Sequence, residues 1–373
     1  MPAARRNSVA FTVLVTVAVA LGALLTLLIL ALSGAPTITL LATALAALPV
    51  GPVLAAYLWL DRYEPEPRAL LVAGLAWGAF VATMAAIVVQ GLGGLLVGFT
   101  DDFSLAVAAP VIEEASKGLF LVLLLWWRRA EVDGILDGIV YAGMVGVGFA
   151  FTENILYLAA AWNGTDGLGP GGIEAVTGTF VIRCIFSPFA HPLFTAFLGI
   201  GIGIAVSSRS RTVRWLAPLG GYLLAVLAHA VWNGSTVFGF GSFAIVYVVI
   251  MAPAFIGMIA LAWWARETEA HVLRMALTDA ARRGLLPATD IGWVVDLRAR
   301  RDARRHARLQ GGPEAERAMR DYQQAAIELG YLHHRLLRGT APADWQTRGQ
   351  DFLGRIQAAR PRIAFPGQVV PQR

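Results

Sequence analysis

Apolar residues run along most of this chain in eight long stretches, with short polar connections between them. A helix needs about 20 predominantly apolar residues to cross the hydrocarbon core of a bilayer. Each stretch meets that length, so the pattern predicts an all-α bundle of about eight transmembrane helices. The expected ranges are 8–32, 38–60, 69–97, 104–127, 135–161, 177–206, 215–237 and 243–264.

The composition agrees with this pattern and divides the chain into two regions. Of the 373 residues, 57% are hydrophobic and only 15% are charged, whereas about a quarter of the residues in soluble domains are charged. Beyond Trp264 the sequence becomes rich in Arg, Ala and Glu, and residues 313–337 have the pattern of an amphipathic helix. We therefore predict a transmembrane domain over residues 1–265 and an Arg-rich helical tail over residues 266–373.

The net charge of +5 is distributed in a way that predicts membrane orientation. Arginines lie in every second connection, at 5–6, 62–68, 128–129 and 209–214. The other connections, around Ser33, Asp101, Gly167 and Gly239, contain neither Lys nor Arg. Positively charged loops stay on the cytoplasmic side, so both termini are expected in the cytoplasm. The basic tail is expected to attract anionic lipid, and the alternation argues against nucleic acid as the partner.

Seven ionisable side chains interrupt four neighbouring apolar stretches. Such a group at membrane depth costs at least about 2.5 to 3.5 kcal/mol on insertion scales, so it usually faces a protein interior or a watery cavity and has a function. These four stretches are therefore the predicted site of function. The seven residues are Glu113, Glu114, Lys117, Glu153, Arg183, His191 and His229.

Lys117 is the only lysine in the chain. It follows Glu113 by four residues and Glu114 by three, so it shares a helix face with both carboxylates. This placement predicts a counter-ion that keeps one carboxylate charged, and the alternative is an ion pair that only fixes helix packing. Arg183 is either a second counter-ion or a side chain that reaches the outer interface.

The acidic and histidine positions lie at similar depths in their stretches. The Glu113–Glu114 pair, Glu153 and His229 each lie eight to ten residues from the external end, which places them roughly 12 to 15 Å below the outer surface. His191 is flanked by Pro188 and Pro192, so its depth does not follow from a residue count.

Glutamate and histidine side chains from different helices can hold a zinc ion and leave one position open for water. Such a water is acidic enough to attack near neutral pH, and a nearby carboxylate can take its proton. Asn233 follows His229 by four residues, so its amide could donate to a developing oxyanion or orient the imidazole.

Small residues recur every four positions along the stretch 135–161, at Gly138, Ala142, Gly146 and Ala150. A stripe of this kind lets another helix approach closely. Glu153 follows the stripe by three residues, so the helix that carries it is expected to be surrounded by other helices.

Five motifs occur in order and on separate predicted helices or loops. They are DRYEPEP at 61–67, EExxK at Glu113, Glu114 and Lys117, FxxxE at Phe149 and Glu153, HPLFTAFLG beginning at His191, and HxxxN at His229 and Asn233. Over residues 50–265 the chain resembles the PrsW family of bacterial intramembrane proteases. That family belongs to a wider superfamily that includes the CAAX-prenyl endopeptidases.

The resemblance implies a peptide-bond hydrolase whose site lies within the bilayer and whose substrates are membrane-anchored proteins such as anti-sigma factors. It also implies an acid-base role for Glu113 and Glu114. Lys117 and Asn233 complete the predicted catalytic set by their spacing from Glu113, Glu114 and His229. The implied ligands of a zinc ion are Glu153, His191 and His229. A glutamate-only mechanism is the alternative, and no small-molecule cofactor is expected. CAAX-type relatives have a histidine where Glu153 stands, which argues against prenylated substrates.

Two other classes of function compete with the hydrolase. A non-catalytic membrane scaffold could keep the ionisable cluster for packing, but it would not need the complete set of acid, base and amide side chains. A proton-coupled transporter could use the Glu and His residues as a relay. Transporters are typically built from repeats with paired broken helices, and the sequence shows no such repeat.

Overall fold

The computed structural model describes residues 3–32, 35–164 and 170–367, and within these ranges the chain forms helices and no strand. The all-α prediction is therefore confirmed. The chain divides into two compact units. The first contains Met1–Asp61 and Glu66–Ala262, and the second contains Arg62–Pro65 and Trp263–Arg373.

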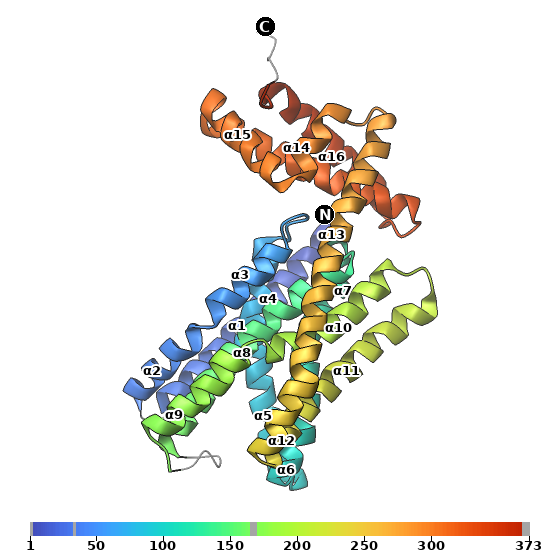
Figure 1. The fold of residues 1–373 in the computed structure, drawn as a ribbon. Helices are drawn as coiled ribbons and strands as arrows, with labels where there is room; N and C mark the ends of the chain where they lie inside the picture. The colour runs from blue at the N-terminus through green and yellow to red at the C-terminus, as the bar shows by residue number, and fades with distance from the viewer. Residues whose placement is uncertain (1–2, 33–34, 165–169, 368–373) are drawn as a thin grey trace. The chain divides into compact units, whose positions relative to one another are not determined.

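The long helices of the first unit lie side by side (Figure 1). The α-helices are α1 (Ala3–Leu32), α2 (Pro36–Ala47), α3 (Val50–Leu60), α4 (Arg68–Ala76), α5 (Thr83–Val97), α6 (Asp101–Phe103), α7 (Ala109–Trp127), α8 (Ile135–Asn163), α9 (Ile173–Phe180), α10 (Ala190–Ser207), α11 (Arg211–Val237) and α12 (Phe240–Val246). Four wider, π-helical segments continue these helices, namely η1 (Trp77–Ala82), η2 (Ser104–Ala108), η4 (Val181–Phe186) and η5 (Tyr247–Met251). A short 3₁₀ turn, η3 (Arg129–Glu131), follows α7.

Within the described residues, seven helices are long and apolar enough to cross a membrane. They are Val9–Leu32, Pro36–Leu60, Arg68–Val97, Ile135–Asn163, Ile173–Ser207, Arg211–Val237 and Phe240–Arg282. The sequence predicted an eighth span at 104–127. That segment is helical and consists of η2 and α7. It is not among the seven apolar helices, because it contains three charged residues, Glu113, Glu114 and Lys117. All three side chains are buried in the protein, so the protein interior covers the charges that lipid would exclude.

Helix α8 is at the centre of the first unit and packs against α10, α2, α4, η1 and α3. Its small-residue stripe lies close to the backbone of α10. A Cβ atom added at Gly138 would lie 2.0 Å from the carbonyl oxygen of Gly199 on α10, and one added at Gly146 would lie 2.7 Å from the Cα atom of Pro192. The predicted close packing of this helix is confirmed, and it brings α10 against the helix that carries Glu153.

Replacing Gly138 by Ala is expected to destabilise the protein, because backbone and not a flexible side chain occupies the space that the methyl group would need. Overpacking of this kind typically costs about 1 to 3 kcal/mol. We expect a lower unfolding midpoint in detergent. Gly220→Ala on α11 is the matched control, because nothing lies within 4 Å of its added Cβ atom. Equal midpoints for the two variants would contradict the close approach.

The second unit is a helical domain with its own hydrophobic core. It contains the end of α13 (Ala252–Arg282), then η6 (Ala288–Asp290), α14 (Ile291–Val295), α15 (Leu297–Leu337), α16 (Trp345–Ala359) and η7 (Arg360–Arg362). Helix α15 breaks at Gly311 and Gly312, where Gly312 has a φ of +69°. Buried core residues include Leu273, Leu277, Val294, Met319, Tyr322, Ile356 and Phe365. The short segment Arg62–Pro65 belongs to this unit because Arg300 donates to the carbonyl oxygens of Arg62 and Tyr63.

A group of carboxylates lies in the first unit around the start of α4 and α8. Tyr141 donates its hydroxyl to Glu66 Oε2 at 2.5 Å, and the Asp61 carboxylate accepts from the backbone N–H of Glu66 at 3.0 Å. Burial raises the pKa of Glu66 well above its usual range, with a further increase from the negative charge of Asp137. Burial likewise raises the pKa of Asp61 to about 7.

These raised pKa values predict a stability that depends on pH. Above a pH of about 4 the unfolded chain releases protons that the folded protein still holds on Glu66 and Asp61. The contribution of these groups to stability is therefore greatest below that pH and decreases as the pH rises towards 7. Glu66→Gln is expected to raise the unfolding midpoint at neutral pH and to flatten its pH dependence. An unchanged slope between pH 4.5 and 8 would contradict this assignment, and the exposed Glu174→Gln is the control.

Candidate metal and catalytic site

The structure brings all seven ionisable residues of the predicted site into one region of the first unit. Glu113, Glu114 and Lys117 come from α7 and Glu153 from α8, while Arg183 lies on η4. His191 is in the first turn of α10, after the break at Ser187–Phe189, and His229 is on α11. The following contacts join them, so residues up to 116 positions apart form one cluster.

Three of these residues form a group that could hold a metal ion. Glu113, His191 and His229 are buried, and each offers one ligand atom within 4.8 Å of the other two. Glu113 Oε2 lies 3.8 Å from His229 Nε2. This oxygen is buried and has no hydrogen-bond partner among the described residues. A buried carboxylate oxygen without a hydrogen bond is unusual. The Lys117 ammonium lies 3.5 Å away, and a metal ion would supply the closer contact that this oxygen lacks.

Glu114 holds His229 in one orientation. Its Oε1 atom lies 2.9 Å from His229 Nδ1 and accepts from Lys117 Nζ at 2.8 Å, while its Oε2 atom accepts from the Thr195 hydroxyl at 2.9 Å. Both oxygens are therefore engaged, and the residue is 1% exposed. A hydrogen bond from Nδ1–H to Glu114 leaves the Nε2 lone pair of His229 directed towards Glu113.

Lys117 is fully buried between the acidic residues and His191. Its ammonium lies 2.8 Å from Glu114 Oε1, 3.5 Å from Glu113 Oε2 and 3.0 Å from His191 Nδ1. It also lies 3.8 Å from the centre of the Phe149 ring. The single lysine thus provides positive charge to both carboxylates that the helical spacing placed on its face.

Glu153 has different partners from Glu113. It forms an ion pair with Arg183 and lies 2.6 Å from His191 Nε2. Arg183 also donates to Asn154 Oδ1 at 2.8 Å and lies over the Tyr157 ring. The group of possible metal ligands thus contains the Glu113 carboxylate, and Glu153, expected as a ligand from the sequence, adjoins this group through His191. Of the two alternatives for Arg183, the structure shows the counter-ion.

Asn233 lies beside this cluster, and its side-chain amide contacts the backbone of η2 instead of His229. Its Nδ2 atom donates to the carbonyl oxygen of Leu105 at 3.0 Å, and the amide nitrogen has a second N–H. Together with Glu153, Arg183 and His191 it lines a cavity with about 20 Å³ accessible to the centre of a water molecule. That space is enough for one ordered water.

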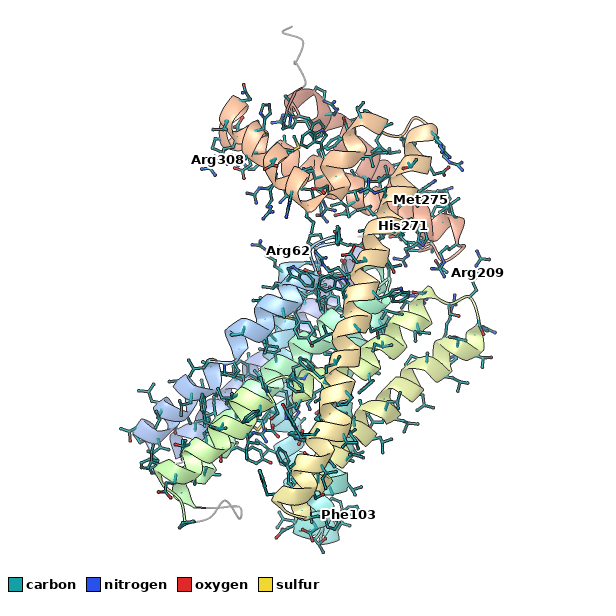
Figure 2. The ribbon with its side chains drawn as sticks, viewed as in Figure 1. Arg62, Phe103, Arg209, His271, Met275 and Arg308 are labelled. Atoms are coloured by element: carbon teal, nitrogen blue, oxygen red, sulfur yellow. The ribbon has the colours of Figure 1, made fainter. Side chains whose placement is uncertain are left out.

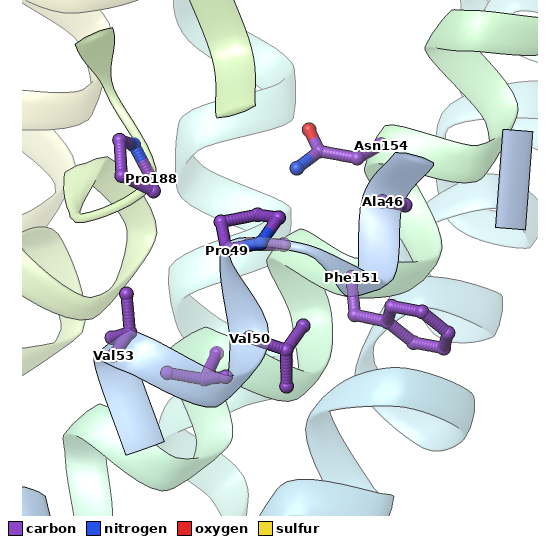
Figure 3. Close-up of a pocket in the computed structure, with 9 residues that line it drawn as sticks. Ala46, Pro49, Val50, Val53, Phe151, Asn154 and Pro188 are labelled. Carbon is purple, nitrogen blue, oxygen red and sulfur yellow. The ribbon is translucent and has the colours of Figure 1, made fainter. Parts of the chain in front are cut away.

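A second hollow adjoins the first along α8 (Figure 3). The break between α2 and α3 forms one wall, with Pro49, and Pro188 contributes from the break before α10. Ala150 and Asn154 line both hollows. The side chains of Ala150 and Asn154 therefore lie between the water-sized cavity at Glu153 and this second, apolar hollow.

Sequence reasoning missed three polar residues of the site. Thr195 contacts Glu114, Asn154 contacts Arg183, and Gln90 Nε2 lies 3.5 Å from Glu113 Oε1. Each is a neutral polar residue inside an apolar stretch, so the membrane-cost argument that identified the charged residues gave a weaker signal for them. Thr195 follows His191 by four residues. This spacing places both on one helix face and could have indicated that Thr195 belongs to the site.

Comparison with known proteins identifies the family. The model of the PrsW family of intramembrane metalloproteases matches residues 66–258. The chain is 28% identical over 187 residues to Protease PrsW of Geobacillus kaustophilus (strain HTA426), covering 49% of this chain and 74% of the relative. It is 26% identical over 204 residues to Protease PrsW of Oceanobacillus iheyensis, covering 54% of this chain and 86% of the relative.

A third relative, Protease PrsW of Bacillus subtilis (strain 168), is 28% identical over 168 residues, covering 44% of this chain and 70% of the relative. No solved structure matches the chain. The family match spans more than half of the chain and includes every residue of the cluster described above. This multi-pass membrane protein therefore belongs to the PrsW family of intramembrane metalloproteases.

Proposed function

We propose that the protein is an intramembrane endopeptidase that hydrolyses membrane-anchored proteins, with anti-sigma factors as the expected type. The observation that carries the proposal is the buried group of Glu113, His191 and His229 inside a membrane helix bundle. Its relatives are named as proteases, and the water-sized cavity beside the group provides a place for hydrolytic water. The competing scaffold function would not require such a cavity.

We propose further that Glu113, His191 and His229 hold a zinc ion. The donors fit, because two imidazoles and one carboxylate are a typical set for a catalytic zinc site with an open position. Glu113 Oε2 has no hydrogen bond, and His229 keeps Nε2 available because Glu114 engages Nδ1. His191 contacts Lys117 and Glu153 with its two ring nitrogens, so it must exchange one partner when it binds. A bound zinc ion would supply a water acidic enough to react near neutral pH.

The remaining residues have proposed roles that follow from their positions. Glu153 faces the water-sized cavity, so it can take a proton from water there, with Arg183 as its counter-charge. Glu114 has no free oxygen, and we assign it to positioning His229 in place of the acid-base role expected from the sequence. The second N–H of Asn233 can donate to a developing oxyanion from the same cavity.

The alternation of arginines supports a cytoplasmic location for both termini and for the region 266–373. The site would then lie below the outer surface, and substrates would be cut in the outer half of the bilayer. A transmembrane substrate must also unwind locally, because each peptide bond of a helix is hydrogen-bonded and shielded.

The test combines metal analysis with cleavage of a reconstituted membrane-anchored substrate. Zinc is expected to copurify with the wild type, to decrease in His229→Ala, and to remain in the control His271→Ala, which alters an exposed tail residue. Chelation should stop cleavage and added zinc should restore it. If cleavage survives chelation but is abolished in Glu113→Gln, the metal-dependent mechanism is rejected and a glutamate-only mechanism is supported. If zinc is bound but no membrane-anchored substrate is cleaved, the proposed protease activity is rejected.

A further inference from the structure

An exposed row of arginines lies on the first half of α15, in the second unit. Arg298, Arg301, Arg305 and Arg308 are all exposed, and their spacing of three, four and three residues places them on one side of the helix. We call these four residues the arginine face. Figure 2 shows Arg308 projecting from the helix.

The opposite side of the same helix is fixed in the core of the second unit. Ala303 and Ala307 are buried. Arg300 donates to the carbonyl oxygens of Val294 and Tyr63, and Arg304 donates to Gln323 Oε1 at 2.6 Å. The helix therefore cannot rotate to hide the arginine face, which is held outward by the packing behind it.

Within the described part of the chain, an ion pair neutralises only one of the four charges of the arginine face, that of Arg308. No ion pair is formed there by Arg298, Arg301 or Arg305, and Arg308 lies 3.3 Å from Glu316. Asp302 is the one acidic residue that helical spacing places among the four arginines. The exposed Leu309, at 75%, adjoins the last of them. The face thus fits a partner with spread-out negative charge and an adjoining apolar layer.

We propose that the arginine face binds a surface of anionic phospholipids. Guanidinium groups match phosphate geometry, because they donate two parallel hydrogen bonds. The helix Phe240–Arg282 continues from an apolar span into the second unit, so the tail stays tethered to a bilayer. Single-stranded nucleic acid is a poorer partner, since its binding sites usually add aromatic side chains for base stacking. Residues 297–310 contain no Phe, Tyr or Trp. This proposal does not depend on the protease activity.

The test uses the full-length protein in lipid nanodiscs. A fluorophore is attached to Gln310→Cys, an exposed position at the end of the arginine face. The only native cysteine, Cys184, is buried and should not react. Lipids with a nitroxide headgroup report proximity by quenching. We expect quenching in nanodiscs of phosphatidylcholine with phosphatidylglycerol, much less in phosphatidylcholine alone, and a loss in 1 M salt, where the Debye length is about 3 Å.

Charge-reversal variants make the assignment specific. Each arginine near an anionic surface contributes about fivefold to partitioning, so Arg301→Glu/Arg305→Glu is expected to weaken it by at least about 25-fold. Arg274→Glu/Arg282→Glu has the same change in net charge at exposed positions of α13 and should keep the quenching. Arg301→Gln/Arg305→Gln should give an intermediate loss of quenching. This neutral variant keeps the test valid if the charge reversal disturbs the fold.

Three results would overturn the proposal. The first is equal quenching in neutral and anionic nanodiscs. The second is full quenching in both variants of Arg301 and Arg305. The third is a fluorophore that responds to an added RNA oligonucleotide and not to phosphatidylglycerol, which would assign the arginine face to nucleic acid.

Discussion

Glu113→Gln is expected to reduce cleavage of a membrane-anchored substrate by about 10²- to 10⁴-fold, the range that a lost acid-base group typically produces. The substitution keeps the shape of the side chain but removes the charge of the buried oxygen that lacks a hydrogen bond. It should also reduce the copurified zinc, because a neutral amide is a weaker ligand than a carboxylate. The measurements are the initial cleavage rate and the metal content of the same preparation.

The two measurements separate the two possible roles of Glu113. Loss of both cleavage and zinc supports the ligand role, whereas loss of cleavage with full zinc content makes Glu113 the base instead. Glu174→Gln is the matched control, since it makes the same change at an exposed position of α9 and should leave both quantities unaltered. A Glu113→Gln enzyme with the wild-type rate would reject the site altogether.

Much of the site could be predicted because of the cost of placing charge in a membrane. That cost identified the charged and histidine residues, and helical spacing alone placed Lys117 with Glu113 and Glu114. The structure shows the same ammonium 2.8 Å from Glu114 and 3.5 Å from Glu113. The small-residue stripe likewise predicted the close approach of α8 to a neighbouring helix.

The grouping of Glu113 with both histidines and the pairing of Glu153 with Arg183 could not be predicted, because these contacts depend on how each helix is rotated. Counting residues from the end of a span gives the depth of a side chain in the membrane, but not the direction in which it points around the helix axis. In the structure Arg183 engages Glu153, and it does so from η4, a π-helical segment. A π-helical turn inserts extra backbone and changes the direction of the side chains that follow, and the apolar sequence gives no sign of it.

The sequence also did not predict that Arg62–Pro65 belongs to the same unit as the tail. The composition changes at Trp264, so we predicted a single boundary near that residue. The carbonyl oxygens of Arg62 and Tyr63 instead accept hydrogen bonds from Arg300, more than 230 residues later. Backbone acceptors have no sequence signature, and a contact of this kind is visible only in the folded unit.

Lys117→Met is expected to give the largest loss of stability. Breaking a buried ion pair by removing one partner typically costs about 3 to 5 kcal/mol, because a charge is left buried without compensation. Lys117 is fully buried, with two carboxylates and His191 within 3.5 Å of its ammonium. The unfolding midpoint in detergent should decrease strongly. Arg211→Met, at an exposed position at the start of α11, should change it little.

A double-mutant cycle with Glu114→Gln shows whether charge or packing causes that loss. Gln can still accept from His229 through its one carbonyl oxygen and donate from its NH2 group to the Thr195 hydroxyl oxygen. It no longer leaves a charge without its counter-ion when Lys117 is absent. The double variant should therefore lose less stability than the sum of the two single variants. If Lys117 acts only by filling space above Phe149, the two losses will add. Additivity within about 0.5 kcal/mol would thus reject the electrostatic role and leave packing as the reason for the single lysine in this chain.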